Sequence, residues 1–466
     1  MQRFAPNHFR GRFGRLLRLH PATLVALGFV TLITLGSGLL MLPQATHAGG
    51  IPLIDAVFTA TSAACVTGLT VVDTGTRFTL FGQWVILGLI QIGGMGVMTV
   101  AVMLFQAIGR NVLFKQRLAM QEVFAHTPRA DILGVVRTVV VFTLVVEAAG
   151  AALLYGEWRA DNPYGRALFL AVFHAVSAFC NAGFSLYSDN MMHFRADTSV
   201  VLTLCALIVL GGIGFPVIQD LADNARARLR RQRARLTVQT KVVLVTSAIL
   251  TAGGTVIYWL LEHAHTLHGV APGESFLIAL FQAVNSRTAG FNSVDIAMLN
   301  EATLAMMIGL MFFGASPGSC GGGVKTTTLA LIVAFIWARV HGLRHVEMFK
   351  RTIPQETVSR SLSLTLMAVG LISVVLFLVL AEHALSGTTG TGIGQHFLGY
   401  LFESVSAFAT VGYSVGTTAT LSDWGKGWVI LLMLVGRIGV LSFAYIIAGG
   451  DTVDTTAHAK ENIMIG

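Results

Sequence analysis

Four glycines, each closing a short apolar segment, are the residues of this chain whose type and spacing could do chemistry. The clearest is Gly412 in Ala409-Thr410-Val411-Gly412-Tyr413, which follows an apolar run from Tyr400 to Phe408. Such a run is too short to cross a bilayer core, which needs about 20 residues. Irregular backbone at membrane depth must be covered by protein or line a water-filled cavity. Its carbonyl oxygens could then replace the water shell of a monovalent cation without carrying net charge.

The same pattern occurs four times, in segments 58–69, 173–184, 281–291 and 402–413. Each begins with Phe and ends in Gly followed by a large apolar residue, and the third is one residue shorter. Self-similarity of this kind is a strong architectural signal. We predict that the glycine and the two residues before it bind the ion in each segment, and we name these triplets the filter segments. They are Val66, Thr67 and Gly68; Asn181, Ala182 and Gly183; Thr288, Ala289 and Gly290; and Thr410, Val411 and Gly412.

Glycine at these positions permits the positive φ that turns successive carbonyls inward. The half-helix before each loop would aim the negative end of its dipole at the centre, which favours a cation. The alternative is that the glycines only allow helices to pack closely.

Three acidic residues, Asp73, Asp189 and Asp295, follow their filter glycines by five or six positions. Carboxylates at the outer mouth of a pathway would concentrate cations before entry. They could equally be solvated loop acids.

The composition is that of a polytopic membrane protein. The chain has 466 residues, 54% of them hydrophobic and 12% charged, and its mean hydropathy is +0.72. The apolar segment after the basic N-terminal arm is too long for a signal peptide, so we expect it to be retained as the first span. The four cysteines show no CxxC spacing, which argues against a disulfide framework or a zinc site. The net charge of +8 is better explained by membrane orientation than by nucleic-acid binding.

Basic residues cluster at 3–18, 110–129, 226–241 and 339–360. The positive-inside rule places these clusters, and so the N-terminus, in the cytoplasm. Each interval between clusters, and the chain after the last, holds two long apolar spans with a short apolar piece between them. The outgoing span, short piece and returning span are 21–42, 53–64 and 80–108; 133–155, 168–179 and 200–218; 242–261, 276–284 and 303–337; and 362–380, 398–408 and 428–447. The sequence therefore predicts an all-α polytopic membrane protein with four tandem membrane–pore–membrane repeats, that is, eight transmembrane helices plus four re-entrant pore loops.

This organisation divides the chain into four repeats joined by cytoplasmic segments. The predicted boundaries are a basic N-terminus at 1–20, repeat 1 at 21–109, a loop at 110–130, repeat 2 at 131–220, a basic loop at 221–240, repeat 3 at 241–338, a loop at 339–357, repeat 4 at 358–449 and a C-terminal tail at 450–466.

The third returning span is interrupted by a glycine-rich stretch, 314–325. The apolar halves on either side would each reach only about 16–18 Å at 1.5 Å per residue, so the interruption lies inside the membrane. Pro317 and the glycines exclude a continuous helix. The residues of this stretch that we single out are Gly314, Ala315, Ser316, Pro317, Gly318, Ser319, Cys320, Gly321, Gly322, Gly323 and Lys325. A static kink is the alternative to a moving element.

Charged residues near these loops are costly at membrane depth and therefore candidates for function. The other returning spans contain Gly93-Gly94-Met95-Gly96 and Gly211-Gly212-Ile213-Gly214, whereas the last has Gly436-Arg437-Ile438-Gly439. We expect Arg437 to contact the carbonyls of the 314–325 stretch, with Glu403 as a weaker candidate. Lys325 could act beside it or extend toward the cytoplasm.

Other polar residues close to the filter segments are predicted to brace the fold. Arg287 would repel a cation, so we expect it to hold the pore helices. His174, Gln282 and Glu403 occupy matching positions in three of the short pieces. We interpret them as hydrogen-bonding groups between repeats.

On these motifs the chain resembles the bacterial Trk/Ktr/HKT superfamily of potassium transporters, most closely the Ktr-type membrane subunit, over about 16–447. The resemblance implies four repeats in a pseudo-fourfold arrangement around one ion pathway, with K⁺ held only by filter carbonyls. Glycine in all four filter segments is, in that family, associated with potassium selectivity. The resemblance also implies that 314–323 is a gate below the filter and that Arg437 lies beside it and helps to block ion passage.

The resemblance further implies a homodimer in the bacterial inner membrane, docked on a cytosolic ring of nucleotide-binding regulatory subunits. The chain has no ATP-binding fold of its own, so nucleotide control would come from that partner. Sodium dependence, common in Ktr systems, is left open by these residues. The basic loop at 226–235 could bind anionic lipid or a regulatory partner, or could serve orientation alone.

Two other classes of function, an enzyme and a secondary transporter, are less consistent with these residues. Gly314-Ala315-Ser316-Pro317-Gly318 has nucleophile-elbow spacing, and 318–326 resembles a phosphate loop, but neither has the α/β setting that its chemistry needs. A secondary transporter of an organic solute is the stronger rival, although such folds usually have inverted halves. A less selective K⁺/Na⁺ permease also stays open.

Overall fold

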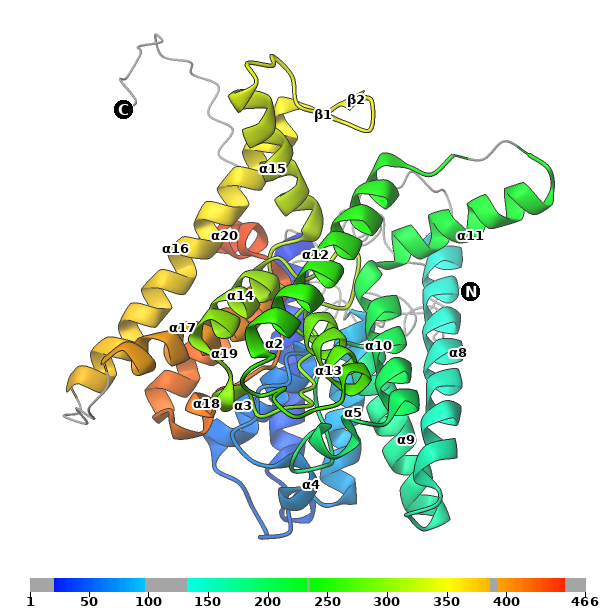
Figure 1. Ribbon diagram of the computed structural model, residues 1–466. Coiled ribbons are helices and arrows are strands. Elements are labelled where there is room, and N and C mark those ends of the chain that lie inside the picture. Colours follow the sequence, from blue (N-terminus) through cyan, green and yellow to red (C-terminus); the bar gives the residue numbers. More distant parts are fainter. Residues whose placement is uncertain (1–20, 97–131, 233–234, 386–392, 449–466) are drawn as a thin grey trace, which may run out of the picture.

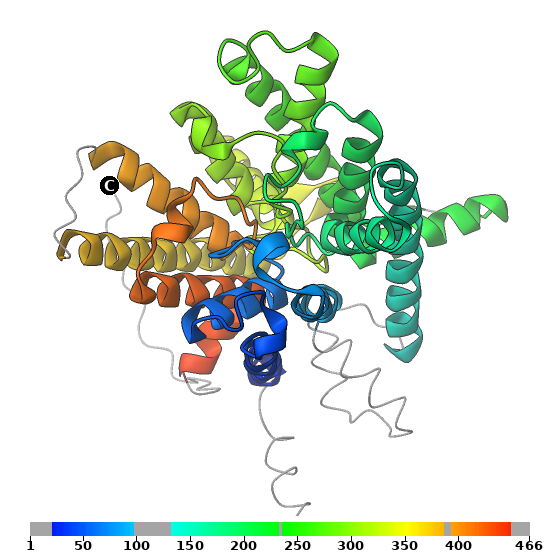
Figure 2. The same ribbon diagram turned by 90° about the horizontal axis from the view of Figure 1, so that it is seen from below.

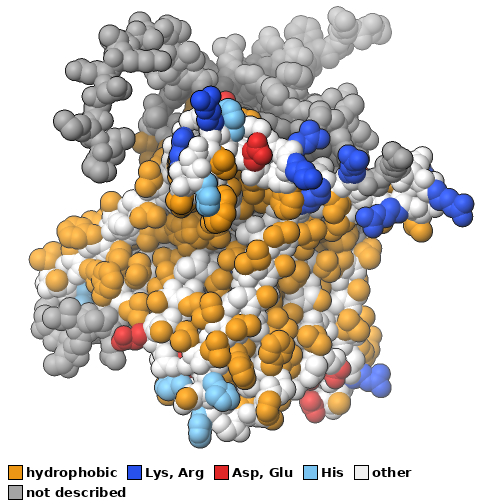
Figure 3. Space-filling view, turned by 45° about the horizontal axis from the view of Figure 1, so that its top comes forward, with side chains coloured by type: hydrophobic (Ala, Val, Ile, Leu, Met, Phe, Trp, Pro, Cys, Tyr) orange, Lys and Arg blue, Asp and Glu red, His pale blue; other side chains and the backbone are white. Residues whose placement is uncertain are grey.

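The computed structural model describes residues 21–96, 132–232, 235–385 and 393–448, which are predominantly helical (Figure 1). The predicted N-terminal arm, the 110–130 loop and the C-terminal tail lie outside these ranges. Four long apolar helices follow the predicted outgoing spans: α2 (Pro21–Leu40), α8 (Ile132–Trp158), α12 (Val238–Glu262) and α16 (Gln355–Leu385). Each is long and apolar enough to cross a membrane. Their outer faces expose large apolar side chains such as Leu35, Val145, Ile249 and Leu366, and an apolar surface suits lipid (Figure 3).

Four shorter helices correspond to the predicted short pieces: α3 (Leu53–Ala64), α9 (Tyr164–Phe179), α13 (Pro272–Asn285) and α17 (Ile393–Ala409). We call them the pore helices. Proline stands just before or at the first position of the first three, where its fixed φ favours a helix start. The phenylalanines that open the repeated motif, Phe58, Phe173, Phe281 and Phe402, are all completely buried. The repeated motif therefore lies inside the molecule, with its apolar start in the core.

The returning helices are α5 (Leu80–Met95), α10 (Thr198–Ile213), α14 (Glu301–Phe312) and α19 (Asp423–Ile438). Side chains cap three of them: Thr79, Asp197 and Ser422 accept hydrogen bonds from backbone N–H groups of the first turn.

Three returning helices end at a glycine with positive φ: Gly96 (84°), Gly214 (95°) and Gly439 (97°). After Gly214 the chain turns by 95° into α11 (Phe215–Leu229), and after Gly439 it turns by 106° into the helix that begins at Val440. The apolar spans predicted at 200–218 and 428–447 are therefore each bent at a glycine, because a positive φ cannot continue a right-handed helix. For 80–108, the described helix ends at Met95 and the rest lies outside the described residues.

The predicted count of eight spanning helices is not reached in the described part of the chain. That part holds four such helices, or six if each bent pair is one span. In the third unit, α14 and α15 (Thr326–Val340) are each too short and are separated by the 314–325 loop.

Figure 2 shows the described helices arranged around a centre. We group each long helix with the pore helix and the returning helix that follow it, and call each group a unit. Within each unit the long helix packs against the pore helix, through the pairs α2–α3, α8–α9, α12–α13 and α16–α17. Between units, each returning helix packs against the next pore helix, through α5–α9, α10–α13 and α14–α17. The last returning helix, α19, packs against the first pore helix, α3. The order of contacts thus closes on itself.

Short elements complete the described chain. They are η1 (Pro43–Ala45), α4 (Thr74–Arg77), η2 (Met192–Phe194), η3 (Ile296–Met298), α18 (Thr417–Thr420) and α20 (Val440–Ala448). A two-stranded antiparallel hairpin joins β1 (Glu347–Met348) to β2 (Arg351–Thr352), with Glu347 opposite Thr352. Its two turn residues, Phe349 and Lys350, both have positive φ, as a type I′ turn requires. Lys and Arg side chains gather at the end of the molecule that carries α11 and this hairpin (Figure 3).

Candidate ion pathway

The filter segments share an unusual backbone. The first residue of each has positive φ: Val66 (59°), Asn181 (59°), Thr288 (78°) and Thr410 (51°). The glycine at the third position is also positive in all four, between 68° and 97°, whereas the middle residue is not. Three of the first residues are β-branched, for which positive φ is a genuine outlier. Strain of this kind persists only where the surroundings enforce it, and it clusters at functional sites.

The four filter glycines contact one another in a closed cycle. A Cβ placed on Gly68 would meet the carbonyl oxygen of Ala182 and the Cα of Gly183, in the second unit. The same relation leads from Gly183 to the third unit, from Gly290 to the fourth and from Gly412 back to the first. In every case the carbonyl oxygen of the residue before the next glycine lies at 2.6 Å or less from the added carbon. The four segments therefore approach one another so closely that each glycine position has room for a hydrogen atom but not for a Cβ.

A column of polar side chains, which the sequence analysis did not single out, braces each filter segment. Ser62 Oγ accepts the N–H of Gly68 at 3.1 Å, and Ser406 Oγ accepts that of Gly412 at 3.2 Å. Asn285 Oδ1 accepts the N–H of the residue after Gly290 at 3.1 Å, and Ser177 Oγ donates to the carbonyl of Phe184 at 2.8 Å. The signal was present in the sequence, since Ser, Ser, Asn and Ser stand at the fifth position of the four aligned motifs.

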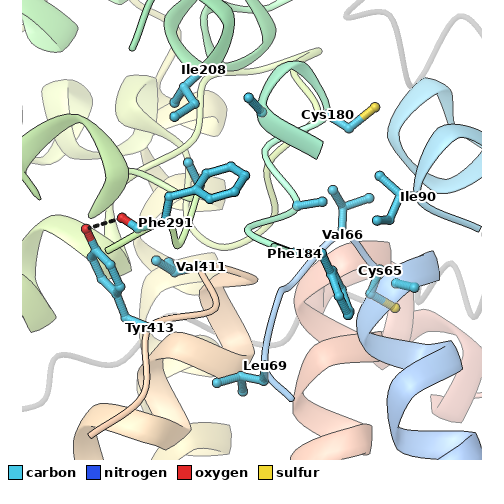
Figure 4. Close-up of a cluster of buried hydrophobic side chains, with 14 of the residues drawn as sticks. Cys65, Val66, Leu69, Ile90, Cys180, Phe184, Ile208, Phe291, Val411 and Tyr413 are labelled. Carbon is cyan, nitrogen blue, oxygen red and sulfur yellow. Dashed lines mark hydrogen bonds between the residues drawn. The ribbon is translucent and has the colours of Figure 1, made fainter. Parts of the chain in front are cut away.

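The large residues after the filter glycines belong to the cluster of buried hydrophobic side chains around the filter segments (Figure 4). Leu69, Phe184, Phe291 and Tyr413 are each no more than 1% exposed. Tyr413 reaches into the neighbouring unit, where its hydroxyl donates to Gln282 Oε1 at 2.5 Å and to the carbonyl of Phe291 at 3.1 Å. These contacts hold the fourth segment against the third.

Glycines of the returning helices let those helices touch the pore-helix ends. A Cβ on Gly93, Gly211 or Gly436 would collide with the carbonyl oxygen of Ala64, Phe179 or Phe408, respectively. Each of these carbonyls stands four residues before its filter glycine. Small residues at these three positions therefore let the returning helices approach the pore-helix ends closely.

The 314–325 loop lies against the first residues of the third and fourth filter segments, beside the residues that end the pore helices. Gly322 N–H donates to Thr410 Oγ1 at 2.9 Å, and a Cβ on Gly321 would meet Thr288 Oγ1. Gly323 N–H donates to the carbonyl of Gly436 at 3.2 Å, and Cys320 N–H to that of Gly211 at 3.2 Å. The carbonyl of Gly318 accepts from the N–H of Phe215 in α11 at 3.0 Å. Within the loop, Ser319 Oγ donates to the carbonyl of Ser316 at 2.7 Å, and Thr326 N–H donates to that of Ala315 at 2.7 Å.

Arg437 and Lys325 both bind this loop. The guanidinium of Arg437 donates to the carbonyl of Cys320, as expected, and to that of Gly93 in the first unit. Glu403 does not bind Arg437. The Lys325 ammonium donates to the carbonyl of Gly321 at 2.8 Å, so it folds back onto the loop instead of extending toward the cytoplasm.

Arg287 fastens the start of the loop to the third unit. Its guanidinium donates to the carbonyl and hydroxyl of Ser247, to Thr251 Oγ1 at 2.9 Å and to the carbonyl of Gly314 at 3.3 Å. Two of these partners lie on α12, so Arg287 braces the unit as predicted and also carries the first residue of the loop.

The matching polar residues of the pore helices behave less uniformly than predicted. Only Gln282 bonds across units, through Tyr413. His174 bonds Leu170, Ser185 and Leu186 within its own unit, and Glu403 accepts from Ser414, Val415 and Thr418. The interpretation as groups between repeats was wrong for these two, because each satisfies the loop that its own pore helix supports.

Two of the three predicted mouth carboxylates act as local caps. Asp73 accepts from the N–H groups of Gly75 and Thr76 at 2.8 and 3.0 Å, and Asp295 accepts from Ala297 at 3.0 Å. Burial alone would raise the pKa of Asp73, but hydrogen bonds from Ser188, Thr76 and Gly75 outweigh it and hold the pKa below its ordinary value. Asp189 lies in the loop before η2, and its side chain makes no capping hydrogen bond of this kind within the described residues.

Residues 24–449 match the TrkH family, which is described as a cation transport protein. The chain belongs to this family. It is 38% identical over 427 residues to the Ktr system potassium uptake protein B of Vibrio alginolyticus, covering 91% of this chain and 90% of that protein. It is 37% identical over 432 residues to the protein of the same name from Bacillus subtilis, with 92% and 93% covered. It is 33% identical to the potassium/sodium uptake protein NtpJ of Enterococcus hirae, with 96% and 98% covered.

The fold is also that of a solved TrkH-family structure. The potassium transporter TrkH from Vibrio parahaemolyticus superposes with a TM-score of 0.69 at 20% identity, covering 91% of this chain and 84% of that one. At this identity the likeness speaks for the fold alone.

This TrkH-family chain has a cavity of about 1340 Å³ that is bounded by the 314–325 loop. Its walls include Cys320, Lys325 and Arg437 together with residues of α2, α8 and α16. No group of three or more His, Cys, Asp or Glu residues that could hold a metal ion occurs within the described ranges.

One buried acid of α8 escaped the sequence analysis. Glu147 is 5% exposed, accepts from Gln91 Nε2 of α5 at 3.0 Å and receives the Cys180 thiol at 3.8 Å. It therefore joins the first returning helix to the residue just before the second filter segment. The only available signal was an acid in the middle of a 27-residue apolar helix, whereas the other acid of this helix, Glu157, lies at its end.

Proposed function

We propose that this chain is a potassium uptake transporter subunit of the Ktr/Trk type, in which K⁺ passes along a central pathway between four pseudo-fourfold repeats. The observation that carries the proposal is the closed cycle of filter glycines, each against the carbonyl of the next unit. The names of its relatives, which specify potassium uptake in two genera and potassium/sodium uptake in a third, support the same substrate class.

The chemistry follows from the alternating backbone of the filter segments. Positive φ at the first and third residues, but not at the second, turns neighbouring peptide carbonyls toward one side of the strand. Four such strands supply rings of neutral oxygens that replace the hydration shell of a monovalent cation. Since no net charge is involved, the ion is held weakly enough to move on.

We propose further that the 314–325 loop is the gate. It lies directly against the first residues of two filter segments, and two cations, Arg437 and Lys325, bind its carbonyls. A positive charge at this depth opposes the passage of a cation. The gate opens when the loop and Arg437 move away together.

The location and partners follow from the same family. We infer an inner-membrane protein with a cytoplasmic N-terminus, a homodimer, and a cytosolic nucleotide-binding regulatory ring that supplies the nucleotide control. The basic end of the molecule, with α11 and the hairpin, is the face toward that partner and toward anionic lipid (Figure 3). We include sodium as a candidate coupling ion, because one relative is named for both potassium and sodium.

Potassium uptake in cells that lack their own uptake systems tests the proposal, with the regulatory partner co-expressed. The wild-type chain should restore growth at low potassium, and Gly290→Ser and Gly68→Ser should each raise the half-saturating K⁺ concentration or admit sodium. Gly253→Ser is the matched control, because a Cβ there meets nothing within 4 Å.

Two outcomes would contradict the proposal. If the wild-type chain moved neither potassium nor sodium, the pore would be excluded and a solute transporter would become the leading hypothesis. If all three serine variants behaved alike, the glycines would serve packing only.

A further inference from the structure

A filter side chain holds the 314–325 loop directly. Gly322 N–H donates to Thr410 Oγ1 at 2.9 Å, with both residues buried. A Cβ on Gly322 would lie 2.6 Å from that oxygen and 3.0 Å from the carbonyl oxygen of Gly436. The loop backbone therefore reaches the hydroxyl only because residue 322 has no side chain.

The equivalent hydroxyl in the third unit is used differently. Thr288 Oγ1 is hydrogen-bonded to the side-chain amide of Asn181 at 3.2 Å, that is, sideways to the neighbouring filter segment. The loop, which the structure describes in full, packs against Thr288 through Gly321 and makes no hydrogen bond to its hydroxyl. Thr288 and Thr410 thus have the same shape and register but differ in whether the loop depends on their oxygen.

The remaining hydrogen bonds from other segments to this loop, within the described residues, come from outside the filter. Carbonyls of Gly211 and Gly436 on returning helices accept from Cys320 and Gly323. In the other direction, Arg437, Arg287 and the N–H of Phe215 donate to the carbonyls of Cys320, Gly314 and Gly318. The bond from Gly322 to Thr410 is therefore the hydrogen bond that joins the loop directly to a filter segment.

We propose that Thr410 is the latch of the gate loop: its hydroxyl holds Gly322 in the closed position, and the loop breaks this bond when it moves. That the loop is a gate rests on the proposed function. Whether Thr410 holds the loop can be measured without any transport of ions. Removing the acceptor leaves a buried N–H without a partner as long as the loop stays in place, which disfavours the closed position. Thr410 acts as a positioning residue for the loop, in addition to its place in the filter.

Cys320 is a native reporter of the loop position. It lies in the loop two residues before Gly322 and lines the cavity, and it is partly exposed, whereas Cys65, Cys180 and Cys205 are buried. The full-length chain, purified in detergent, is treated with a small methanethiosulfonate reagent, and the modified Cys320 peptide is quantified over time by mass spectrometry. This readout needs neither ion flux nor a known membrane orientation.

Four variants are compared with the wild type. Thr410→Val keeps the shape and removes the acceptor, so Cys320 labelling should become at least about fivefold faster, the factor expected for one unpaired buried donor. Thr410→Ser keeps the hydroxyl and should label at the wild-type rate. Thr288→Val is the matched control and should also label at the wild-type rate. Thr410→Ala replaces Thr410→Val if size-exclusion chromatography shows that the valine variant does not fold.

The outcomes separate the latch from the proposed function. Unchanged labelling in the variant without the hydroxyl would overturn the latch even if potassium uptake were normal. Equal acceleration in Thr288→Val would overturn it too, because the whole filter would then have loosened. Failure of the wild-type chain to carry potassium would remove the proposed function while the labelling still reported on the bond.

Discussion

At the residue scale, the filter depends on neutral groups that hold a strained backbone. Ser406 illustrates this, since its hydroxyl accepts the partly buried N–H of Gly412 at 3.2 Å. A buried N–H left without a partner costs about 1–3 kcal/mol. The backbone of the filter would relax to recover that energy, and the spacing of its carbonyl oxygens would change.

We therefore predict that Ser406→Ala raises the ratio of sodium to potassium uptake about tenfold. Ser37→Ala is the control, because Ser37 Oγ donates to the carbonyl of Ile33 within one helix and its loss leaves no backbone N–H unpaired. The measurement is rubidium and sodium flux in proteoliposomes. Equal flux ratios in the two variants would contradict the role of the hydroxyl.

Arg437 supports a second prediction at this scale. Its guanidinium joins the carbonyl of Cys320 in the 314–325 loop to that of Gly93 in the first unit. Arg437→Ala should raise uptake several-fold in cells without the regulatory partner, because it removes both a positive charge and two bonds that keep the loop in place. Arg437→Lys should lie between alanine and wild type, since an ammonium keeps the charge but lacks the fork that spans two carbonyls. An alanine variant with unchanged partner-free uptake would contradict the blocking role.

At the element scale, the returning helices are fitted to the pore helices by single glycines. A Cβ on Gly436 would overlap the carbonyl oxygen of Phe408, the end of the fourth pore helix. Overpacking of this kind usually costs about 1–3 kcal/mol. Because the carbonyl of Gly436 also accepts from Gly323, the strain would reach the loop.

Gly436→Ala should therefore lower the midpoint of thermal unfolding in detergent by a few degrees. Gly427→Ala in the same helix is the control, since a Cβ there meets nothing within 4 Å and alanine favours a helix more than glycine does. Fluorescence-detected size exclusion after heating measures both. A midpoint that falls equally in the two variants would show that the effect is not due to this contact.

The elements also show what the sequence could and could not predict. The pore helices and filter segments were located to within a few residues, because four copies of one motif reinforce each other where a single short apolar run would be ambiguous. The bends at Gly214 and Gly439 were missed, because hydropathy continues through them and does not report φ. The serines and the asparagine that brace the filter segments stand at the same position of all four motifs. They were not predicted as functional, because only the glycines of the motifs were interpreted as forming the pathway. Glu147 was missed because one acid in an apolar helix acquires meaning only when its neighbours from α5 and α9 are known.

At the scale of the whole molecule, the ring must be closed between its first and last units. Lys426 Nζ of α19 lies 2.7 Å from Asp55 Oδ1 in the first turn of α3, and the two side chains are only 14% and 15% exposed. The Arg195–Glu274 pair joins the second and third units in a comparable way, but at 3.4 Å and with exposures of 49% and 27%. Both pairs join neighbouring units but differ in burial, so the strength of the two ion pairs can be compared directly.

Double-mutant cycles on thermal stability should separate these two ion pairs. Exposed pairs contribute about 0–1 kcal/mol because water screens them, whereas a pair held mostly out of water interacts more strongly and costs more to break. We expect the coupling energy between Asp55→Asn and Lys426→Met to be about 1–2 kcal/mol, and that between Glu274→Gln and Arg195→Met to be about 0.5 kcal/mol or less. Exchanging the charges through Asp55→Lys with Lys426→Asp should restore part of the lost stability. A coupling no larger than that of the exposed pair would mean that helix packing between α19 and α3, and not this ion pair, closes the ring.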